Sequence, residues 1–362
     1  MLLSDYAYAL PLQQIAQRPL EDRAASRMLL LDRAFGEYRD SAFSNLAELL
    51  RGDELILVNN TRVIPARLLG ERLNTVPSSS DHKATANRRV EILLSRQVDE
   101  VTWEALVRPG RKMRVGQRIQ FGDGELAAEV IAHGDHGERT LRFSSNTEAT
   151  VEEHIERLGH IPLPPYIDRA DEPADRERYQ TIFGSRPGAI AAPTAGLHFT
   201  PAILGSIRAR GIEVCELTLH VGLGTFQPIR TETLEGHTMH GEAYEIPVAT
   251  AEKITRAKNA GRRVLAVGTT TVRALEDAAI RAAESGAAEV VCSGRAETHL
   301  FITPSFQFRL VDALLTNFHL PRSTLLALVC AFAGREKVLA AYEHAVHGGY
   351  RFYSYGDCML IR

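Results

Sequence analysis

Residues 264–276 read VLAVGTTTVRALE, and no other segment indicates the architecture of the chain so plainly. The four apolar residues at 264–267 predict a buried strand, Gly268 predicts a turn, and 272–284 has the composition of a helix. The same succession recurs on either side. Strands are expected at 55–58, 189–192 and 214–221, and helices at 201–210, 249–260 and from 323 onward. Such alternation predicts a mixed or parallel α/β sheet.

The pattern changes between residues 62 and 147, where short β-type segments alternate with glycines. These segments are expected at 90–94, 101–107, 118–121, 125–131 and 139–143. Their length and spacing predict a small β-barrel or sandwich. We therefore expect an α/β fold, with a mixed α/β main domain formed by both chain ends and an inserted small β-barrel domain. The main domain should cover residues 1–61 and 148–362, with helical segments before the strand at 55–58.

Composition excludes several classes of protein. The chain has 362 residues, of which 44% are hydrophobic and 24% charged, so it is long enough for two or three domains with real cores. The uncharged apolar segment at 323–334 is much shorter than the roughly 20 residues of a membrane span. The four cysteines form no C-x-x-C pair, and no basic residue precedes Arg18 as in a secretory signal. These features predict a cytoplasmic protein without a membrane span, a disulfide framework or a zinc site.

Charge is unevenly distributed along the chain. The net charge is -3, which argues against broad binding of nucleic acid. Residues 62–118, however, hold twelve basic and six acidic residues, a local charge of +6. Arg111, Lys112 and Arg114 stand together in this region. A solvated loop and a contact with a polyanion are both consistent with this cluster.

The segment PTAGLHFT, residues 193–200, lies between an expected strand and a helix that begins at Pro201. Ligands bind at the carboxyl ends of strands in α/β sheets, so Thr194 and His198 are candidate site residues. Thr200 has the place and type of a helix N-cap. A buried structural histidine is the alternative for His198.

A second candidate site lies in the segment 264–276, where Thr269, Thr270 and Arg273 follow the strand expected at 264–267. Free backbone N–H groups at a helix start, together with hydroxyls and an arginine, suit a carboxylate or a phosphate. The alternative is an ordinary threonine cap with a solvated arginine in the first turn.

Two further turns carry polar or aromatic residues. In the turn at 220–226, Gly222 and Gly224 allow close approach of a flat ligand on which Phe226 could stack. In the turn at 316–321, Asn317 and His319 could read the edge of a nucleobase, with an Asx turn as the alternative.

Residues 237–242, HTMHGE, have the composition of a metal site. Gly236 and Gly241 bracket the two histidines and disfavour the helix that would align them, and no third His or Cys follows at ligand spacing. We therefore expect no metal site, and interpret Glu242 or one of these histidines as a proton-transfer group instead.

Seven blocks closely resemble the S-adenosylmethionine:tRNA ribosyltransferase-isomerase (QueA) family of queuosine biosynthesis. They occur in one order along the chain: NNTRVIPARL (59–68), PPYI with RYQT (164–181), AAPTAGLHFT (191–200), HVGLGTFQP (220–228), VGTTTVRALE (267–276), TNFHLP with STLL (316–326) and YRFYSYGDCMLI (350–361). The chain departs from the family pattern at 297–305, so no role is assigned to His299, Thr303 or Ser305.

The resemblance implies an enzyme that transfers and isomerises the ribosyl part of S-adenosylmethionine onto 7-aminomethyl-7-deazaguanine at the tRNA wobble position. The product is epoxyqueuosine, and adenine and methionine are released. S-adenosylmethionine is then a substrate, and neither a metal nor a redox cofactor is expected. The partners implied are tRNA and S-adenosylmethionine, and we expect a monomer.

The reaction requires a base, an acid and an anion clamp. By position and residue type we assign proton transfer to His198 and His319, either of which could be the base, and we count Thr194 as a third catalytic candidate. The remaining assignments are binding roles. The methionine carboxylate goes to Arg273, Thr269 and Thr270, the adenine to Gly222, Gly224 and Phe226, the modified base to Asn317, and tRNA phosphates to Arg111, Lys112 and Arg114.

Two other functions would explain part of the pattern. A methyltransferase would release S-adenosylhomocysteine, but the chain lacks the glycine-rich strand-turn-helix, with a following acidic residue, that such domains usually carry. A non-catalytic RNA-binding module would explain the basic segment but would leave the polar turns of the α/β part without a role.

Overall fold

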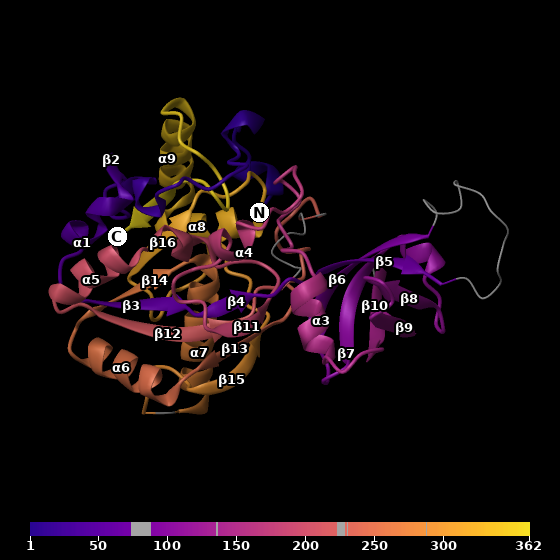
Figure 1. The fold of residues 1–362 in the computed structure, drawn as a ribbon. Coiled ribbons are helices and arrows are strands. Elements are labelled where there is room, and N and C mark those ends of the chain that lie inside the picture. Colours follow the sequence, from indigo (N-terminus) through magenta and orange to yellow (C-terminus); the bar gives the residue numbers. More distant parts are fainter. Residues whose placement is uncertain (74–87, 135–136, 223–228, 230, 287) are drawn as a thin grey trace.

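The computed structural model describes residues 1–362 except 74–87, 135–136, 223–228, 230 and 287. Figure 1 shows a large α/β domain with a smaller β-barrel at its side, which confirms the predicted fold class. In the part of the chain that is described, no helix is long and apolar enough to cross a membrane.

The main domain is built on a mixed sheet. Within the described residues its order is β15-β13-β12-β3-β14-β16-β17-β1-β2. The strands are β1 (Arg27–Leu31), β2 (Tyr38–Ala42), β3 (Glu54–Asn59), β12 (Glu213–Leu219), β13 (Glu242–Ile246), β14 (Arg263–Val267), β15 (Gly294–Thr298), β16 (Ala313–Asn317) and β17 (Cys358–Ile361). Strands β12, β3, β14 and β16 run parallel to one another, so their carboxyl ends meet at one edge of the sheet.

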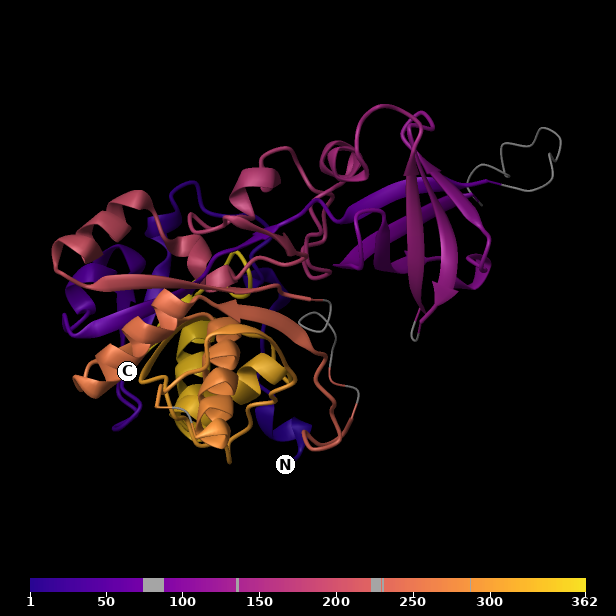
Figure 2. The ribbon, with the colours of Figure 1, turned by 90° about the horizontal axis from the view of Figure 1, so that it is seen from below.

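Both faces of this sheet are covered by helices (Figures 1 and 2). The helices of the main domain are α1 (Leu46–Leu49), α4 (Asp175–Arg178), α5 (Pro201–Ala209), α6 (Val248–Asn259), α7 (Thr269–Ser285), α8 (Thr324–Ala333) and α9 (Arg335–His347). In β3, Leu55 and Leu57 belong to the core under α6 to α9, whereas Ile56 and Val58 belong to the core under α1 and α5. A strand buried on both sides explains the uninterrupted apolar run in the sequence.

Strands β5 to β10 close into an antiparallel barrel of order β10-β7-β6-β5-β8-β9. They are β5 (Arg67–Arg72), β6 (Arg89–Gln97), β7 (Thr102–Arg108), β8 (Arg118–Phe121), β9 (Leu126–His133) and β10 (Glu138–Ser145). Alternate side chains such as Val90, Ile92 and Leu94 fill the interior. The helix α3 (Val151–Leu158) packs Val151 and Ile155 onto this core.

The barrel leaves the sheet at the edge where the parallel strands end. The chain passes from β3 through β4 (Thr61–Val63) into β5, and it returns through α3 to β11 (Arg186–Ala189), which pairs in parallel with β4. This connection places the barrel beside the carboxyl ends of the parallel strands, where α/β proteins bind their ligands.

Several local predictions are wrong. Residues 27–31 and 38–42 form β1 and β2 rather than helical segments, and the strand expected at 189–192 ends at Ala189. Helix α7 begins at Thr269 instead of residue 272. Arg273 therefore lies beyond the first turn. Thr200 does cap α5, accepting a hydrogen bond from the N–H of Ile203.

Candidate active site

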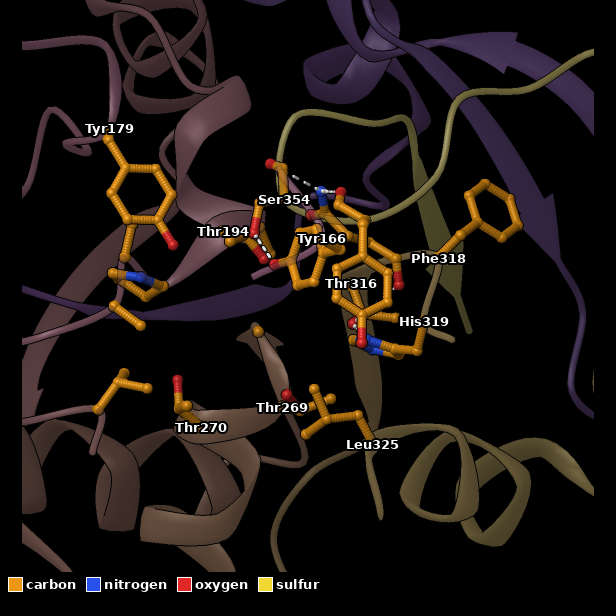
Figure 3. Close-up of a pocket in the computed structure, with 18 residues that line it drawn as sticks. Tyr166, Tyr179, Thr194, Thr269, Thr270, Thr316, Phe318, His319, Leu325 and Ser354 are labelled. Atoms are coloured by element: carbon orange, nitrogen blue, oxygen red, sulfur yellow. Dashed lines mark hydrogen bonds between the residues drawn. The ribbon is translucent and has the colours of Figure 1, made fainter. Parts of the chain in front are cut away.

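A pocket lies at the carboxyl ends of β12, β14 and β16. Figure 3 shows Thr269 and Thr270 on one side of it and Tyr166, Tyr179 and Ser354 on the other. Of the residues predicted from the sequence, the pocket brings together Thr194, Thr269, Thr270, Asn317 and His319. Asn317 is the last residue of β16, Thr269 and Thr270 begin α7 directly after β14, and Thr194 and His319 lie in the connections that follow β11 and β16.

The start of α7 is the part of the pocket that is suited to bind an anion. Gly268 adopts φ of +90°, a conformation open to glycine, and so turns the chain from β14 directly into the helix. The hydroxyl of Thr271 donates to the carbonyl of Val267 at 2.7 Å, whereas Thr269 and Thr270 line the pocket. The Oγ1 atom of Thr270 is buried and has no hydrogen-bond partner among the described residues. The first N–H groups of a helix and a hydroxyl without a partner suit a carboxylate.

Asn317 at the end of β16 has a fixed orientation. Its Nδ2 donates to the carbonyl of Tyr353 at 2.9 Å, and its Oδ1 lies 3.2 Å from Nε2 of His198. Because Oδ1 can only accept, Nε2 of His198 carries the hydrogen, and Nδ1 is left to accept from Ser26 Oγ at 2.8 Å. His198 thus lies behind Asn317 and is not among the residues that line the pocket.

His319 faces the pocket directly. Its Nε2 lies 2.9 Å from the hydroxyl of Thr316, which is also at the pocket wall. Burial lowers the pKa of His319 from its ordinary value to about 3. Burial also lowers the pKa of His198, to about 4, although the hydrogen bond that His198 donates to Asn317 acts in the opposite direction. Both imidazoles are therefore neutral at physiological pH, so neither is present as an imidazolium that could donate a proton before the reaction.

Arg273 is placed differently from the prediction. It is buried, forms an ion pair with Glu242 of β13, and donates to the carbonyl of Leu300 at 3.0 Å. The other carboxylate oxygen of Glu242 accepts from the N–H of Gly222 at 3.3 Å. Arg273 does not line the pocket; it acts through Glu242 on the chain beside Val221, which does line it. Direct contact between Arg273 and a ligand stays a prediction.

The pocket also contains aromatic residues to which no role was assigned from the sequence. Tyr166 and Tyr179 come from the segment before β11, and Tyr353 from the segment before β17. Tyr166 shares a hydrogen bond of 2.5 Å with the hydroxyl of Ser354. The sequence did carry a signal for the three tyrosines and Ser354, because they lie in the PPYI, RYQT and YRFYSYGDCMLI blocks.

The other candidates lie elsewhere. Gly222 follows the pocket residue Val221, whereas Gly224 and Phe226 are outside the described residues. Arg111, Lys112 and Arg114 are exposed on the connection between β7 and β8 of the barrel. Among the described residues, no group of three or more His, Cys, Asp or Glu side chains is arranged to hold a metal ion.

Comparison with known proteins gives matches along the whole chain. A sequence profile for the family described as queuosine biosynthesis protein matches residues 3–361. A relative from Solibacter usitatus, named S-adenosylmethionine:tRNA ribosyltransferase-isomerase, is 51% identical over 369 residues, with 100% of each chain covered. A relative of the same name from Carboxydothermus hydrogenoformans is 49% identical over 361 residues, again with 100% of each covered.

A solved structure agrees with these matches. The crystal structure of S-adenosylmethionine tRNA ribosyltransferase from Thermotoga maritima is 34% identical, with a TM-score of 0.54, and the match covers 99% of this chain and 100% of that one. The resemblance inferred from the seven sequence blocks is confirmed. The chain belongs to the queuosine biosynthesis protein family.

Proposed function

We propose that the chain is an S-adenosylmethionine:tRNA ribosyltransferase-isomerase. It moves the ribosyl part of S-adenosylmethionine onto the aminomethyl group of the 7-deazaguanine base at the tRNA wobble position, isomerises it to epoxyqueuosine, and releases adenine and methionine. The observation that carries this proposal is the family match over the whole chain, in a fold whose strand ends gather hydroxyl, amide, imidazole and aromatic groups in one pocket.

The donor carboxylate binds at the start of α7. The hydroxyls of Thr269 and Thr270 and the free N–H groups of the first turn provide hydrogen bonds and the positive end of the helix dipole. Arg273 supports this site from behind, because its pair with Glu242 holds both α7 and the backbone at Gly222. Gly224 and Phe226, farther along the same turn, are proposed to hold the adenine.

His319 moves the proton. The positive sulfur acidifies the C–H of the adjacent ribose carbon, and the neutral imidazole of His319 accepts that proton. The resulting buried imidazolium is a strong acid, so it passes the proton to a ring nitrogen of adenine as the bond between adenine and ribose breaks. The proton has then moved from carbon to adenine, and His319 is neutral again. Thr194 supplies a nearby hydroxyl for the substrate.

Asn317 positions the base that receives the sugar. Its amide N–H groups are engaged by the carbonyls of Tyr353 and Ser354, so the second lone pair of Oδ1 remains to accept from an amine of the deazaguanine. His198 is a positioning residue in this proposal, because its Nε2–H holds Oδ1 in place.

The barrel binds tRNA. Arg111, Lys112 and Arg114 contact phosphates, and the barrel stands at the edge of the sheet that also holds the pocket. We further propose that the enzyme acts as a monomer in the cytoplasm, where its tRNA substrate is found. No metal or redox cofactor takes part, since the sulfonium itself activates the ribose; addition of a zinc chelator with magnesium retained tests this point.

The proposed function is tested by incubating the protein with labelled S-adenosylmethionine and tRNA that carries the deazaguanine precursor. We expect free adenine and methionine to appear in step with a sugar-modified tRNA. Formation of S-adenosylhomocysteine with a methylated RNA would refute the proposal.

A further inference from the structure

Tyr353 has a backbone conformation that side chains of its size rarely adopt. Its φ is +74°, in the left-handed region. A bulky residue in this region is strained, and it persists only where its surroundings hold it. Strain of this kind concentrates at sites that bind or react, so the position of the Tyr353 ring needs a reason.

The surroundings fix both polar backbone groups of Tyr353. Its N–H donates to the carbonyl of Phe318 at 3.1 Å, and its carbonyl accepts from the N–H of Gly356 at 2.9 Å. The same carbonyl accepts from Nδ2 of Asn317 at 2.9 Å. Since His198 sets the orientation of Asn317, the conformation of Tyr353 is tied to the network behind the pocket.

The result of this arrangement is an aromatic corner in the pocket. Tyr353 packs edge-on against Tyr166, with their ring planes at 75°. The hydrogen bond of 2.5 Å between Tyr166 and Ser354 holds the second ring. Leu325 adds apolar surface to the same pocket, where Figure 3 shows it beside Thr269.

We propose that Tyr353 and Tyr166 form a stacking surface for a fused heteroaromatic ring, either a purine or a deazapurine. A flat ring is the ligand that an edge-on pair of tyrosines beside aliphatic side chains accommodates best, and the hydroxyl, amide and imidazole groups of the pocket can bond its edge. This inference rests on the proposed function, which supplies two such rings: the adenine of the donor and the modified base of tRNA.

The test replaces the ring while keeping the backbone. Tyr353→Asn removes the aromatic ring but tolerates the left-handed conformation, whereas Tyr353→Phe keeps the ring. The two variants are titrated with S-adenosylmethionine in the absence of tRNA. In a second arm, they are titrated with an anticodon stem-loop that carries either the deazaguanine or guanine. Tyr38→Asn, an exposed tyrosine of β2 outside the pocket, is the matched control.

We expect Tyr353→Asn to lose about 5- to 150-fold in affinity in one arm, as for loss of one stacked base, while Tyr353→Phe retains most of it. A loss confined to the first arm assigns the surface to adenine, and a loss confined to the deazaguanine stem-loop assigns it to the tRNA base. Unchanged affinity in both arms overturns the inference, as do equal losses in both arms or an equal loss in Tyr353→Phe. A wild-type protein that releases no adenine would instead refute the proposed function.

Discussion

The Nε2 atom of His198 lies 3.2 Å from Oδ1 of Asn317, and this contact makes the histidine a donor to the amide. One residue lines the pocket and the other stands behind it. In the proposed function, Asn317 therefore contacts the substrate and His198 orients Asn317. His319, the second histidine predicted from the sequence, faces the pocket itself.

The two histidines should differ in kinetics. His319→Gln removes the proton carrier, so we expect the rate at saturating substrate to fall about 100- to 10,000-fold with little change in donor binding. His198→Ala should act mainly by releasing Asn317, so we expect the rate to fall about tenfold and the KM for tRNA to rise. His198→Gln, which offers an N–H toward Asn317, should recover part of this loss. Steady-state rates against both substrates measure these effects, and equal losses in His319→Gln and His198→Ala would contradict the division.

Stability should fall in mild acid. The folded pKa values of His198 and His319 are about 4 and about 3, below the ordinary value of about 6.5 that applies to the unfolded chain. Below pH 6.5 the unfolded chain binds protons that the folded chain does not, so each histidine lowers the free energy of unfolding by up to about 1.4 kcal/mol per pH unit. The loss should continue to about pH 4 for His198 and pH 3 for His319.

Denaturant titrations over this pH range measure the effect. Comparison with His319→Gln isolates one histidine from the carboxylates that also titrate in acid. A variant whose stability depends on pH as steeply as that of the wild type would show that His319 is not the source.

The pair Arg273–Glu242 should contribute more to stability than to direct binding. Arg273→Ala removes the cation that pairs with the buried carboxylate of Glu242, and breaking such a pair costs about 3–5 kcal/mol. Combining Arg273→Met with Glu242→Gln removes both charges and keeps an acceptor for Gly222, so we expect stability and donor affinity to return together. The melting temperature and a titration with S-adenosylmethionine provide the two measurements. Recovered stability with donor affinity still about 10- to 150-fold low would instead place Arg273 on the donor carboxylate.

The basic residues of the barrel should determine how strongly tRNA binding depends on the salt concentration. Replacing Arg111, Lys112 and Arg114 by Ala should weaken the binding of tRNA. It should also reduce the slope of log affinity against log salt concentration by about 0.9 for each lost phosphate contact. Affinity for S-adenosylmethionine should hardly change, because these residues do not line the pocket.

A matched control comes from basic residues of α5 and α6, which Figures 1 and 2 show at the far end of the molecule from the barrel. It replaces Arg208, Lys253 and Arg256 by Ala. If this control flattens the salt dependence as much as the barrel variant does, tRNA docks elsewhere and the basic run is a solvated loop.

The two-part architecture could be predicted because its signals are local. Buried parallel strands such as β3 and β14 appear as apolar runs, and the barrel strands as short β-type segments between glycines. Strand β2, with the sequence YRDSA, is a polar edge strand, and β15, with the sequence GRAET, lies at the other edge. Such strands carry no apolar run, because they need not bury both faces.

The site was predictable where a residue follows a strand and was not where two distant segments meet. Thr269 and Asn317 lie directly at strand ends, so a turn in the sequence indicated them. The partner of Arg273 is Glu242, on another strand, and nothing in the local sequence indicates that pairing. Tyr166 and Tyr353 likewise reach the pocket from long connections whose course the sequence does not specify.

The place of β17 in the sheet has a consequence for biosynthesis. Residues 358–361 lie between β16 and β1, so β1 has its parallel partner only after the ribosome has made almost all of the described chain. The barrel strands, by contrast, all lie within residues 67–145 and pair only with one another, so the whole barrel can form once this segment has been made. A nascent chain should therefore carry a folded barrel while the main sheet is still open, and its exposed apolar strands would need a chaperone until β17 has been made.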